Sequence, residues 1–414
     1  MQTTALLLGA CTLLLAASPA TAVDPGTTIT ADNVAEAENM LLPGVVDAVR
    51  RGMRIEVVEP RRVEWRKAYR LATEKNAGQA RLGPAGELLD YVAGLPFLNL
   101  EPDDPQMGDK VVWNYAFGPW IADDVVTWSF QWETGHLSAS GMKVQSGENR
   151  DSEQSKWLRL VGRTEVPPLP AFPDNPARVM AMQIFGPTLP VFLSLVRSGP
   201  MLVYRHLSLE EDDVWYYTSW DRKSRRIPAR IRYEAFGDVV IDLNSSFGLD
   251  VPHGSYTWRY LGEKPMLGVL HARSYPSEWC PGAGNFAPCE VWEKRTALLV
   301  EGTPTQGHDI YGKRVLAIDK EAWVVLATDL YDRDGKRWKV WMNFWSHRPY
   351  ARGGADAEEQ AYLLGGSGID FPDEKAIRWR LPGTRPLAEA VKINTGLTPA
   401  DFSQAGLGSA FTSE

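Results

Sequence analysis

The sequence has few of the residues from which metal and nucleotide sites are built. It holds 3 Cys and 6 His among 414 residues, and no two His stand at the i, i+4 or H-x-H spacing of a zinc site. It contains no P-loop, and the GGSG run at 365–368 does not match the G-x-S-x-G elbow of a serine hydrolase. These absences favour a protein without a metal ion, a cofactor or a catalytic motif.

Long basic runs are also missing. The chain has 44 Lys and Arg against 52 Asp and Glu, so its formal net charge is −8. Proteins that bind polyanions concentrate positive charge, so this balance argues against nucleic acid or an anionic membrane as the main partner. Acidic pairs at Asp103-Asp104, Asp123-Asp124 and 210–213 leave a carbohydrate-active enzyme as a third functional class. We expect these pairs to lie in solvated turns.

Only one apolar run has the length of a targeting segment. Residues 5–17 (ALLLGACTLLLAA) are followed by Ala-Thr-Ala at 20–22, which is typical of a signal-peptide cleavage site. The run is shorter than the ~20 residues of a transmembrane helix. The sequence therefore predicts a signal peptide at 1–22 and an exported chain from 23 to 414. Lipidation at Cys11, with outer-membrane association, is the alternative.

Two cysteines remain in the exported chain. Cys280 and Cys289 flank a Pro- and Gly-rich loop (WCPGAGNFAPCE) without a His. In an oxidising compartment this arrangement predicts a disulfide, with free thiols as the alternative.

Aromatic residues are abundant, with 16 Trp, and two groups alternate with polar or small residues. Trp113, Tyr115 and Phe117 form one triplet, and Trp128, Phe130 and Trp132 form the other. A period of two predicts that each triplet lies on one face of a strand. The aromatic side chains, with Tyr217, then either fill a core, line a cavity for an apolar ligand, or stack on carbohydrate.

The remaining pattern predicts helices first and strands later. We expect a helix over 31–42 that ends at Pro43-Gly44, a short segment over 45–51 and a helical region over 61–76. Strands are predicted at 202–206, 214–220, 229–236, 257–261, 294–301, 313–319, 323–331 and 337–345. Hairpin turns at 319–322 and 333–336 indicate antiparallel pairing, and the apolar run at 190–196 is expected to form a helix or lid.

Several separated motifs, in order, resemble one family. They are ITADNV at 29–34, LLPGVVDAVRRGMRIEVVEP at 41–60, the basic turn WDRKSRRIP at 220–228, Y-G-K-R-x-x-x-I-D at 311–319 and W-x5-D-x-Y-D-x-x-G at 323–335. The chain is similar in these segments to the exported domain-of-unknown-function family 1329, whose fold is similar to that of the LolA/LolB-type periplasmic lipoprotein carriers.

The resemblance implies an α+β fold with a curved, mainly antiparallel sheet, a half-open barrel covered by helices. We expect a single domain from residue 23, with a helical and extended part (23–110), a β half-barrel (111–350) and a C-terminal extension (351–414). The resemblance also implies a periplasmic, non-catalytic carrier of a lipid or other hydrophobic molecule. The partners would be an RND-superfamily transporter and an outer-membrane protein. The alternative is a structural adaptor of such a transport system, with a filled core and no cargo.

The basic turn is the second candidate site. Arg222, Lys223, Arg225 and Arg226 lie within five residues and match the family motif. We interpret them either as a docking site for an acidic partner or a lipid headgroup, or as a solvated hairpin.

Overall fold

A computed structural model describes most of the chain. The described residues are 23–129, 131–149, 155–173, 178–184, 200–207, 211–218, 221–233, 240, 242–305, 307, 309–350 and 358–407. The predicted signal peptide (1–22), Phe130 and the apolar run at 190–196 lie outside these ranges.

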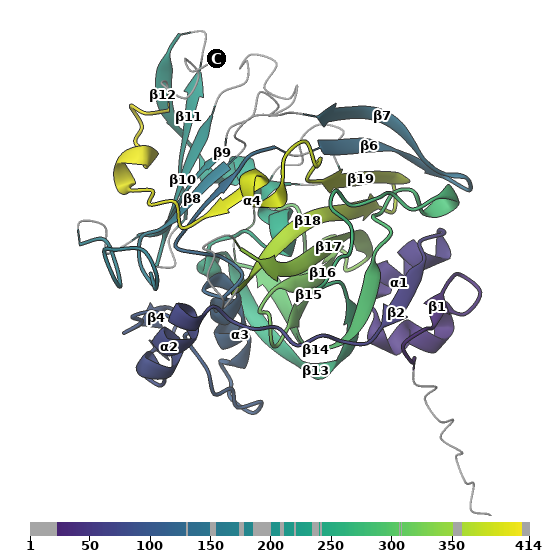
Figure 1. Ribbon diagram of the computed structural model, residues 1–414, viewed down its shortest axis with the longest axis horizontal. Helices are drawn as coiled ribbons and strands as arrows, with labels where there is room; N and C mark the ends of the chain where they lie inside the picture. Colours follow the sequence, from purple (N-terminus) through teal and green to yellow (C-terminus); the bar gives the residue numbers. More distant parts are fainter. Residues whose placement is uncertain are drawn as a thin grey trace, which may run out of the picture.

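The larger of two main sheets carries most of the core. Eleven strands belong to it within the described residues, and all of its pairings are antiparallel except that of β2 with β14. Its order is β1 (Thr28–Ile29), β2 (Ile55–Val58), β14 (Val291–Pro304), β15 (Lys313–Asp319), β16 (Val325–Tyr331), β17 (Arg337–Pro349), β18 (Glu359–Asp370), β19 (Lys375–Arg380), β6 (Gln131–Ser138) and β7 (Gly141–Asn149), and β13 (Tyr256–Gly268) also pairs with β14. The sheet does not close into a barrel, and Figure 1 shows β13–β18 at the centre of the molecule.

A second sheet stands beside it. Its order is β12 (Lys223–Ile227), β11 (Asp213–Thr218), β10 (Met201–His206), β9 (Arg178–Ile184), β8 (Ser155–Arg159), β5 (Asp124–Thr127) and β20 (Val391–Ile393). The chain leaves this sheet after β5 and enters the larger one at β6, so it crosses between the two sheets after Thr127 and before Gln131. β3 (Arg81–Leu82) and β4 (Leu88–Leu89) form a separate two-stranded sheet.

The predicted mainly antiparallel sheet is confirmed, and two local predictions are wrong. Residues 107–116 form the helix α3 (Met107–Ala116), not a strand, and 229–233 form a 3-10 helix (Ala229–Tyr233). In α3 the buried Val111, Tyr115 and Met107 recur at the helical spacing of four, and this period, not the alternation of aromatics, decides the local structure.

The N-terminal helices also differ from expectation. Pro43 starts α1 (Pro43–Arg50) instead of ending a helix, because proline suits the first helical turn, where its missing N–H has no partner to lose. The preceding segment is a 3-10 helix, Val34–Met40. The predicted helical region at 61–76 contains α2 (Lys67–Asn76).

Glycine at position 44 permits α1 to approach the larger sheet closely. A Cβ at this position would lie 2.3 Å from an Asp329 carboxylate oxygen and 2.6 Å from Val340 Cβ. The Gly44 N–H donates to both Asp329 oxygens, at 3.1 and 3.0 Å. The buried carboxylate thus satisfies an N–H in the first turn of α1 and holds the helix on β16 and β17.

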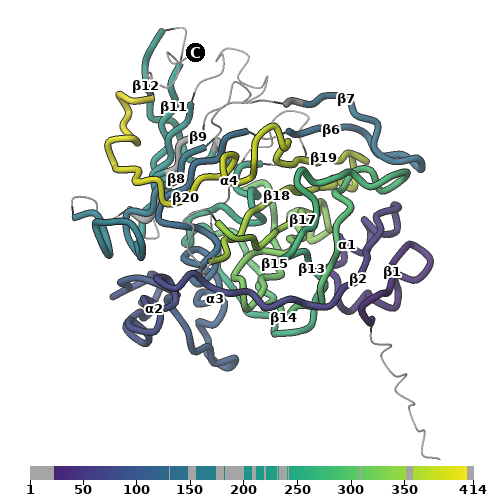
Figure 2. Tube along the Cα trace, in the orientation of Figure 1, coloured from purple at the N-terminus to yellow at the C-terminus, as the bar shows by residue number. Residues whose placement is uncertain are grey.

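The chain beyond residue 350 belongs to both sheets. β18 and β19 continue the larger sheet, so this sheet extends past residue 350. The last described residues include α4 (Leu387–Ala390), β20 and a 3-10 helix (Pro399–Phe402), and they run beside the smaller sheet (Figure 2). Phe402 and Leu407 are buried there against Leu158, Leu202 and Tyr217.

The predicted disulfide is confirmed between Cys280 and Cys289. Its loop lies on the larger sheet: Ser367 donates to the Phe286 carbonyl at 2.6 Å, and Asn285 exchanges hydrogen bonds with the backbone of Met142. The disulfide therefore fastens a loop that buries Phe286 completely.

We expect the double substitution Cys280→Ser, Cys289→Ser to lower the free energy of unfolding by about 2–3 kcal/mol, because the bridge restricts the unfolded chain. Urea unfolding followed by Trp fluorescence measures this loss. Reduction of the wild-type protein with a thiol should reproduce it. Equal stability of the variant and the oxidised wild type would contradict the expectation.

Candidate functional site

An aromatic cluster connects the two main sheets. We call Tyr115 (α3), Trp120, Trp157 (β8), Phe247 and Trp345 (β17) the inter-sheet aromatic cluster. The Trp120 ring lies at its centre, with centroid distances of 5.5 Å to Tyr115, 6.4 Å to Trp157, 6.0 Å to Phe247 and 5.7 Å to Trp345. Phe247 meets Trp157 edge to face at 4.9 Å. These separations are those of favourable aromatic pairs.

Hydrogen bonds fix the position of Trp120. Its indole N–H donates to the Tyr115 carbonyl at 2.8 Å, and its carbonyl accepts from the Gln360 side chain at 2.7 Å. The Tyr115 hydroxyl donates to the Leu249 carbonyl at 2.7 Å, and burial raises the pKa of Tyr115 above its ordinary value, so the hydroxyl stays a neutral donor. The cluster is therefore held at both sheets by directional contacts.

Strand register places further apolar side chains on the same face of the smaller sheet. Val125 lies opposite Trp157, and Ile227 lies opposite Val214, which is itself opposite Val203. All of these residues share one hydrophobic cluster with Trp120 and Phe247. Several of its members are only half-buried: Trp120, Val125, Ile227, Leu243 and Phe247. This face thus leaves apolar surface incompletely covered at the junction of the sheets.

Phe247 has a strained backbone. Its φ is +56°, in the left-handed region that bulky residues rarely adopt, within a 3-10 segment (Leu243–Gly248). The surroundings impose this conformation, since the Asn343 side chain donates to the Phe247 carbonyl at 2.8 Å and Thr328 donates to the Gly248 carbonyl at 3.0 Å. Such strain costs on the order of 1–3 kcal/mol and is found most often at functional sites.

Buried polar groups flank Leu243 in the same segment. Tyr311 donates to Asp242 at 2.6 Å, and the Arg314 guanidinium donates to the Tyr256 hydroxyl at 2.6 Å. The Asn244 carboxamide and one Asp242 oxygen are buried and have no hydrogen-bond partner among the described residues. Buried groups without a hydrogen-bond partner are uncommon in folded proteins. The Asn244 carboxamide and the Asp242 oxygen can therefore still form hydrogen bonds.

The residues predicted to line a cavity are separated by the fold. Trp113 and Phe117 are buried in the core around α3, where the Trp113 indole N–H donates to the Gly86 carbonyl at 2.8 Å. Only Tyr115 of the first triplet belongs to the inter-sheet aromatic cluster. Tyr217 lies on the opposite face of the smaller sheet, against the C-terminal residues.

The two described members of the second triplet, Trp128 and Trp132, lie where the chain passes from the smaller sheet to the larger one. Trp128 is half-buried after β5, with its ring under the Arg385 guanidinium at 4.6 Å. Trp132 lies on β6, opposite Trp379 of β19. The two triplets therefore do not share one surface.

Exposed cations of the predicted basic turn lie on the hairpin of β11 and β12. Arg222, Lys223, Arg225 and Arg226 are all exposed. Arg225 pairs with Asp221, and Arg226 pairs with Asp213.

The prediction of solvated acidic turns is wrong for Asp123 and Asp124. Both side chains are buried, Asp123 accepts backbone N–H groups of Thr164, Glu165 and Val166, and Asp124 accepts those of Thr395 and Gly396. These carboxylates hold in place the loops that contain Thr164–Val166 and Thr395–Gly396.

Sequence reasoning missed Trp120, Trp157 and Phe247. The high Trp content was a signal, but the three residues come from different segments and show no shared spacing. Only the packing of the two sheets brings them together.

None of the helices in the described ranges is long and apolar enough to cross a membrane.

Comparison with known proteins identifies relatives of the chain. It is 25% identical over 349 residues to the uncharacterized protein PA3922 of Pseudomonas aeruginosa, covering 78% of this chain and 70% of that protein. A DUF1329 family protein from Desulfovibrio piger has a similar structure, with 14% identity, a TM-score of 0.43, and coverage of 69% of this chain and 92% of that chain. The LolA superfamily protein NE2245 from Nitrosomonas europaea aligns with 10% identity, a TM-score of 0.35, and coverage of 68% and 90%.

The family assignment rests on a match over most of the chain. Residues 28–395 match the family described as "Protein of unknown function (DUF1329)", which confirms the resemblance seen in the sequence motifs. The chain therefore belongs to the DUF1329 family.

Proposed function

We propose that the protein is a non-catalytic periplasmic carrier that binds a lipid or another hydrophobic molecule at the inter-sheet aromatic cluster. The observation that carries this proposal is the half-buried apolar face formed by Trp120, Val125, Ile227, Leu243 and Phe247 at the junction of the sheets. Covering such a face with an apolar ligand contributes about 25 cal/mol per Å² of buried surface, before the cost of association.

The strained Phe247 and the unpaired Asn244 support the same proposal. A backbone held in a costly conformation keeps the Phe247 ring in place beside Trp157. Asn244 precedes it by three residues and offers a donor and an acceptor for a polar group of the cargo. A molecule with an apolar body and a small polar end fits both features.

The partners are part of this proposal. The signal-peptide pattern and the family resemblance support work in the periplasm beside an RND-superfamily transporter and an outer-membrane protein.

A structural adaptor of the transport system is the second candidate. The burial of Trp113 and Phe117 in a packed core favours it, since these aromatics were expected to line a cavity. In this function the protein would bind its partners and no cargo.

Organic extraction and mass spectrometry of the protein, purified gently from its native envelope, distinguish the two functions. A stoichiometric hydrophobic species, absent from a mock purification, supports the carrier. A clean extract that stays clean after candidate lipids are offered, together with co-purification of envelope proteins, supports the adaptor.

Phe247→Ala is expected to weaken binding of the hydrophobic probe N-phenyl-1-naphthylamine about tenfold. Removal of a half-buried phenyl ring forfeits about 1.5 kcal/mol or more of apolar contact, and 1.4 kcal/mol corresponds to a factor of ten. Probe fluorescence on titration measures the affinity.

Leu169→Ala is the matched control, because Leu169 is an apolar side chain that is 50% exposed outside the cluster. Ile227→Ala, on the same face as Phe247, provides a second variant if Phe247→Ala does not fold. Unchanged probe affinity in folded Phe247→Ala and Ile227→Ala would exclude this half-buried apolar face as the binding site.

A further inference from the structure

The hairpin of β11 and β12 stands at the edge of the smaller sheet. β12 is the outermost strand in the order of that sheet, and Figure 1 shows the hairpin at the periphery of the molecule. Its strands pair from Val214 with Ile227 to Thr218 with Lys223, so the turn lies around Asp221 and Arg222. The hairpin is thus placed to contact a large partner without obstruction from the larger sheet.

Positive charge is concentrated on this hairpin. Four exposed basic residues lie within five positions in its turn and on β12: Arg222, Lys223, Arg225 and Arg226. Asp221 and Asp213 pair with two of them, which leaves a local excess of two positive charges. The whole chain carries a formal net charge of −8, so the hairpin opposes the sign of the rest of the protein.

Two of these cations have no carboxylate partner in the part of the chain that the structure describes. Arg222 and Lys223 take part in none of its ion pairs, whereas Arg225 is held by Asp221. The Arg225 hydrogen bond lowers the pKa of Asp221, so that carboxylate stays charged and keeps Arg225 occupied. The unpaired cations are therefore available to an external anion.

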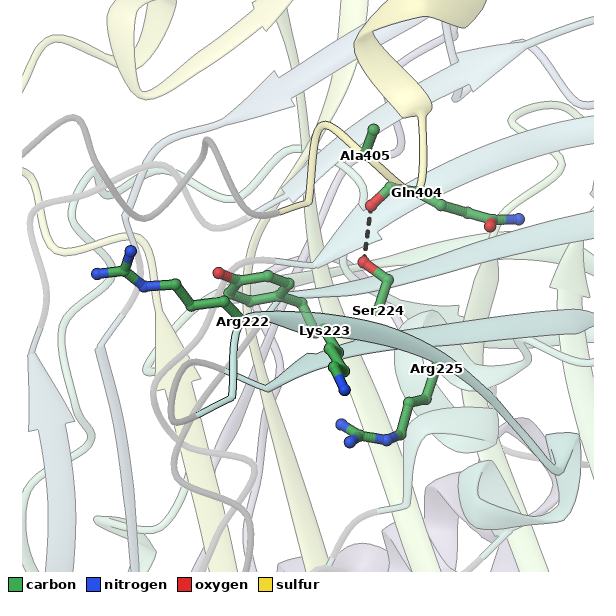
Figure 3. Close-up of a pocket in the computed structure, with 7 residues that line it drawn as sticks. Arg222, Lys223, Ser224, Arg225, Gln404 and Ala405 are labelled. Carbon is green, nitrogen blue, oxygen red and sulfur yellow. Dashed lines mark hydrogen bonds between the residues drawn. The ribbon is translucent and has the colours of Figure 1, made fainter.

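The cations surround the hairpin instead of converging on one point. Lys223 and Arg225 alternate with Ser224 and Arg226 along β12, so successive side chains point to opposite faces of the sheet. Figure 3 shows Lys223 and Arg225 extending to one side and Arg222 extending from the turn. This distribution matches an extended plane of negative charge better than a single bound ion.

Arg222 has a left-handed backbone conformation, which is unfavourable for arginine. Its φ is +54°, in the left-handed region, where glycine or asparagine would avoid strain. Charged side chains on an edge strand also discourage pairing with another strand. That role is served by the strand cations and does not explain an arginine at this strained turn position.

An open hollow lies next to the turn. It has a volume of about 510 Å³ and is lined by the hairpin, including Tyr217, Arg222 and Ser224, and by Gln404 and Ala405. Ser224 donates to the Gln404 carbonyl at 2.7 Å, as Figure 3 shows, and this bond fastens the C-terminal residues to the hairpin. The hollow offers space for one headgroup beside the Arg222 side chain.

From this geometry we propose that the β11–β12 hairpin docks the protein on the anionic surface of a phospholipid bilayer. Each Lys or Arg near such a surface contributes about 1 kcal/mol of attraction, and several act together. The chain as a whole carries a net negative charge. The negative potential of the bilayer therefore repels the rest of the protein and orients it with the hairpin toward the bilayer. This docking does not depend on whether the protein carries a cargo.

Cosedimentation with vesicles tests the proposal directly. The full exported chain is expected to bind vesicles of phosphatidylcholine mixed with phosphatidylglycerol and not vesicles of phosphatidylcholine alone. Added salt should weaken the binding, because exposed charges are screened. The double substitution Arg222→Gln, Lys223→Gln should lower the affinity for the anionic vesicles at least tenfold.

A matched variant removes the same charge elsewhere. Arg54→Gln with Lys336→Gln replaces two exposed cations far from β12 in the sequence, one of them in another hairpin turn. We expect this control to change vesicle affinity less than twofold. Arg222→Gly removes the charge and relieves the left-handed strain, so it should weaken vesicle binding without lowering the thermal midpoint.

Three results would overturn the proposal: no binding of the wild-type protein to anionic vesicles, equal losses in the two double variants, or full vesicle binding by the hairpin variant. In the last case, loss of binding to an acidic envelope protein by the same variant would assign the hairpin to a protein partner instead.

Discussion

Arg232→Ala is expected to lower the free energy of unfolding by about 3–5 kcal/mol. Arg232 belongs to a buried cluster of four charged residues in which two arginines alternate with two aspartates. Its guanidinium donates to Asp212 and to an Asp250 carboxylate oxygen at 2.6 Å, and Arg205 donates to the same two carboxylates at 2.9 and 2.6 Å. Loss of one cation leaves a buried carboxylate uncompensated, which costs this much in other proteins.

Electrostatics within the cluster agree with this expectation. Burial alone would raise the pKa of Asp250, but the attraction of Arg205 and Arg232 outweighs it and lowers the pKa overall. The same carboxylates raise the pKa of Arg205 above its ordinary value. Asp250 and Arg205 therefore stay charged, and each is held by oppositely charged partners within the cluster. The cluster fastens β10 to the 3-10 helix at Ala229–Tyr233 and to Asp250, so its loss should affect the smaller sheet first.

Urea unfolding measures the loss, and Arg230→Ala provides the control. Arg230 is exposed on the same 3-10 helix, two residues before Arg232, and its replacement should change stability by less than ~0.5 kcal/mol. A loss below 1 kcal/mol for Arg232→Ala, or equal losses for the two variants, would contradict the role given to the cluster.

The second prediction with a large effect concerns the dependence of the free energy of unfolding on pH. Burial raises the pKa of Asp329 from the ordinary value of an aspartate to about 7, against the opposing effect of the Gly44 N–H. Between pH 4 and pH 7 the folded protein therefore holds a proton that the unfolded chain releases. The stability contributed by this group is complete below the unfolded pKa and is lost as pH rises through the folded pKa.

Asp329→Asn should remove this dependence, because an amide oxygen still accepts from Gly44 and does not titrate. From pH 5 to pH 8 we expect the wild type to lose on the order of 2 kcal/mol more than the variant. Other buried groups titrate in both proteins, and the lowered pKa of His347, about 4, works in the opposite direction. The difference between the two proteins therefore isolates Asp329.

Free energies of unfolding at the two pH values provide the measurement. Asp334→Asn, an exposed position in the hairpin turn that follows β16, is the control and should retain the wild-type pH dependence. Parallel pH profiles for the wild type and Asp329→Asn would show that Asp329 does not titrate in this range.

The sequence pattern predicted secondary structure most accurately for strands with one buried face. β15 follows the predicted bounds exactly as residues 313–319, and the Asp-Gly turn joins β16 and β17 as expected. The pattern failed at 111–117, because aromatics at every second position of a helix that is buried on most sides look like a strand. α3 has seven buried residues among ten, and a helix buried on most sides lacks the polar face that would have identified it.

The sequence by itself determined the family, through separated motifs in a fixed order. It also determined the mainly antiparallel sheet, the disulfide and the exposed basic turn, because each of these depends on residues that are close together in the chain. Only the tertiary structure decided which aromatics meet. Trp120, Trp157, Phe247 and Trp345 come from a loop, two strands and a 3-10 segment up to 225 positions apart, and the packing of two sheets joins them. Such contacts depend on strand order and register, which local periodicity does not encode.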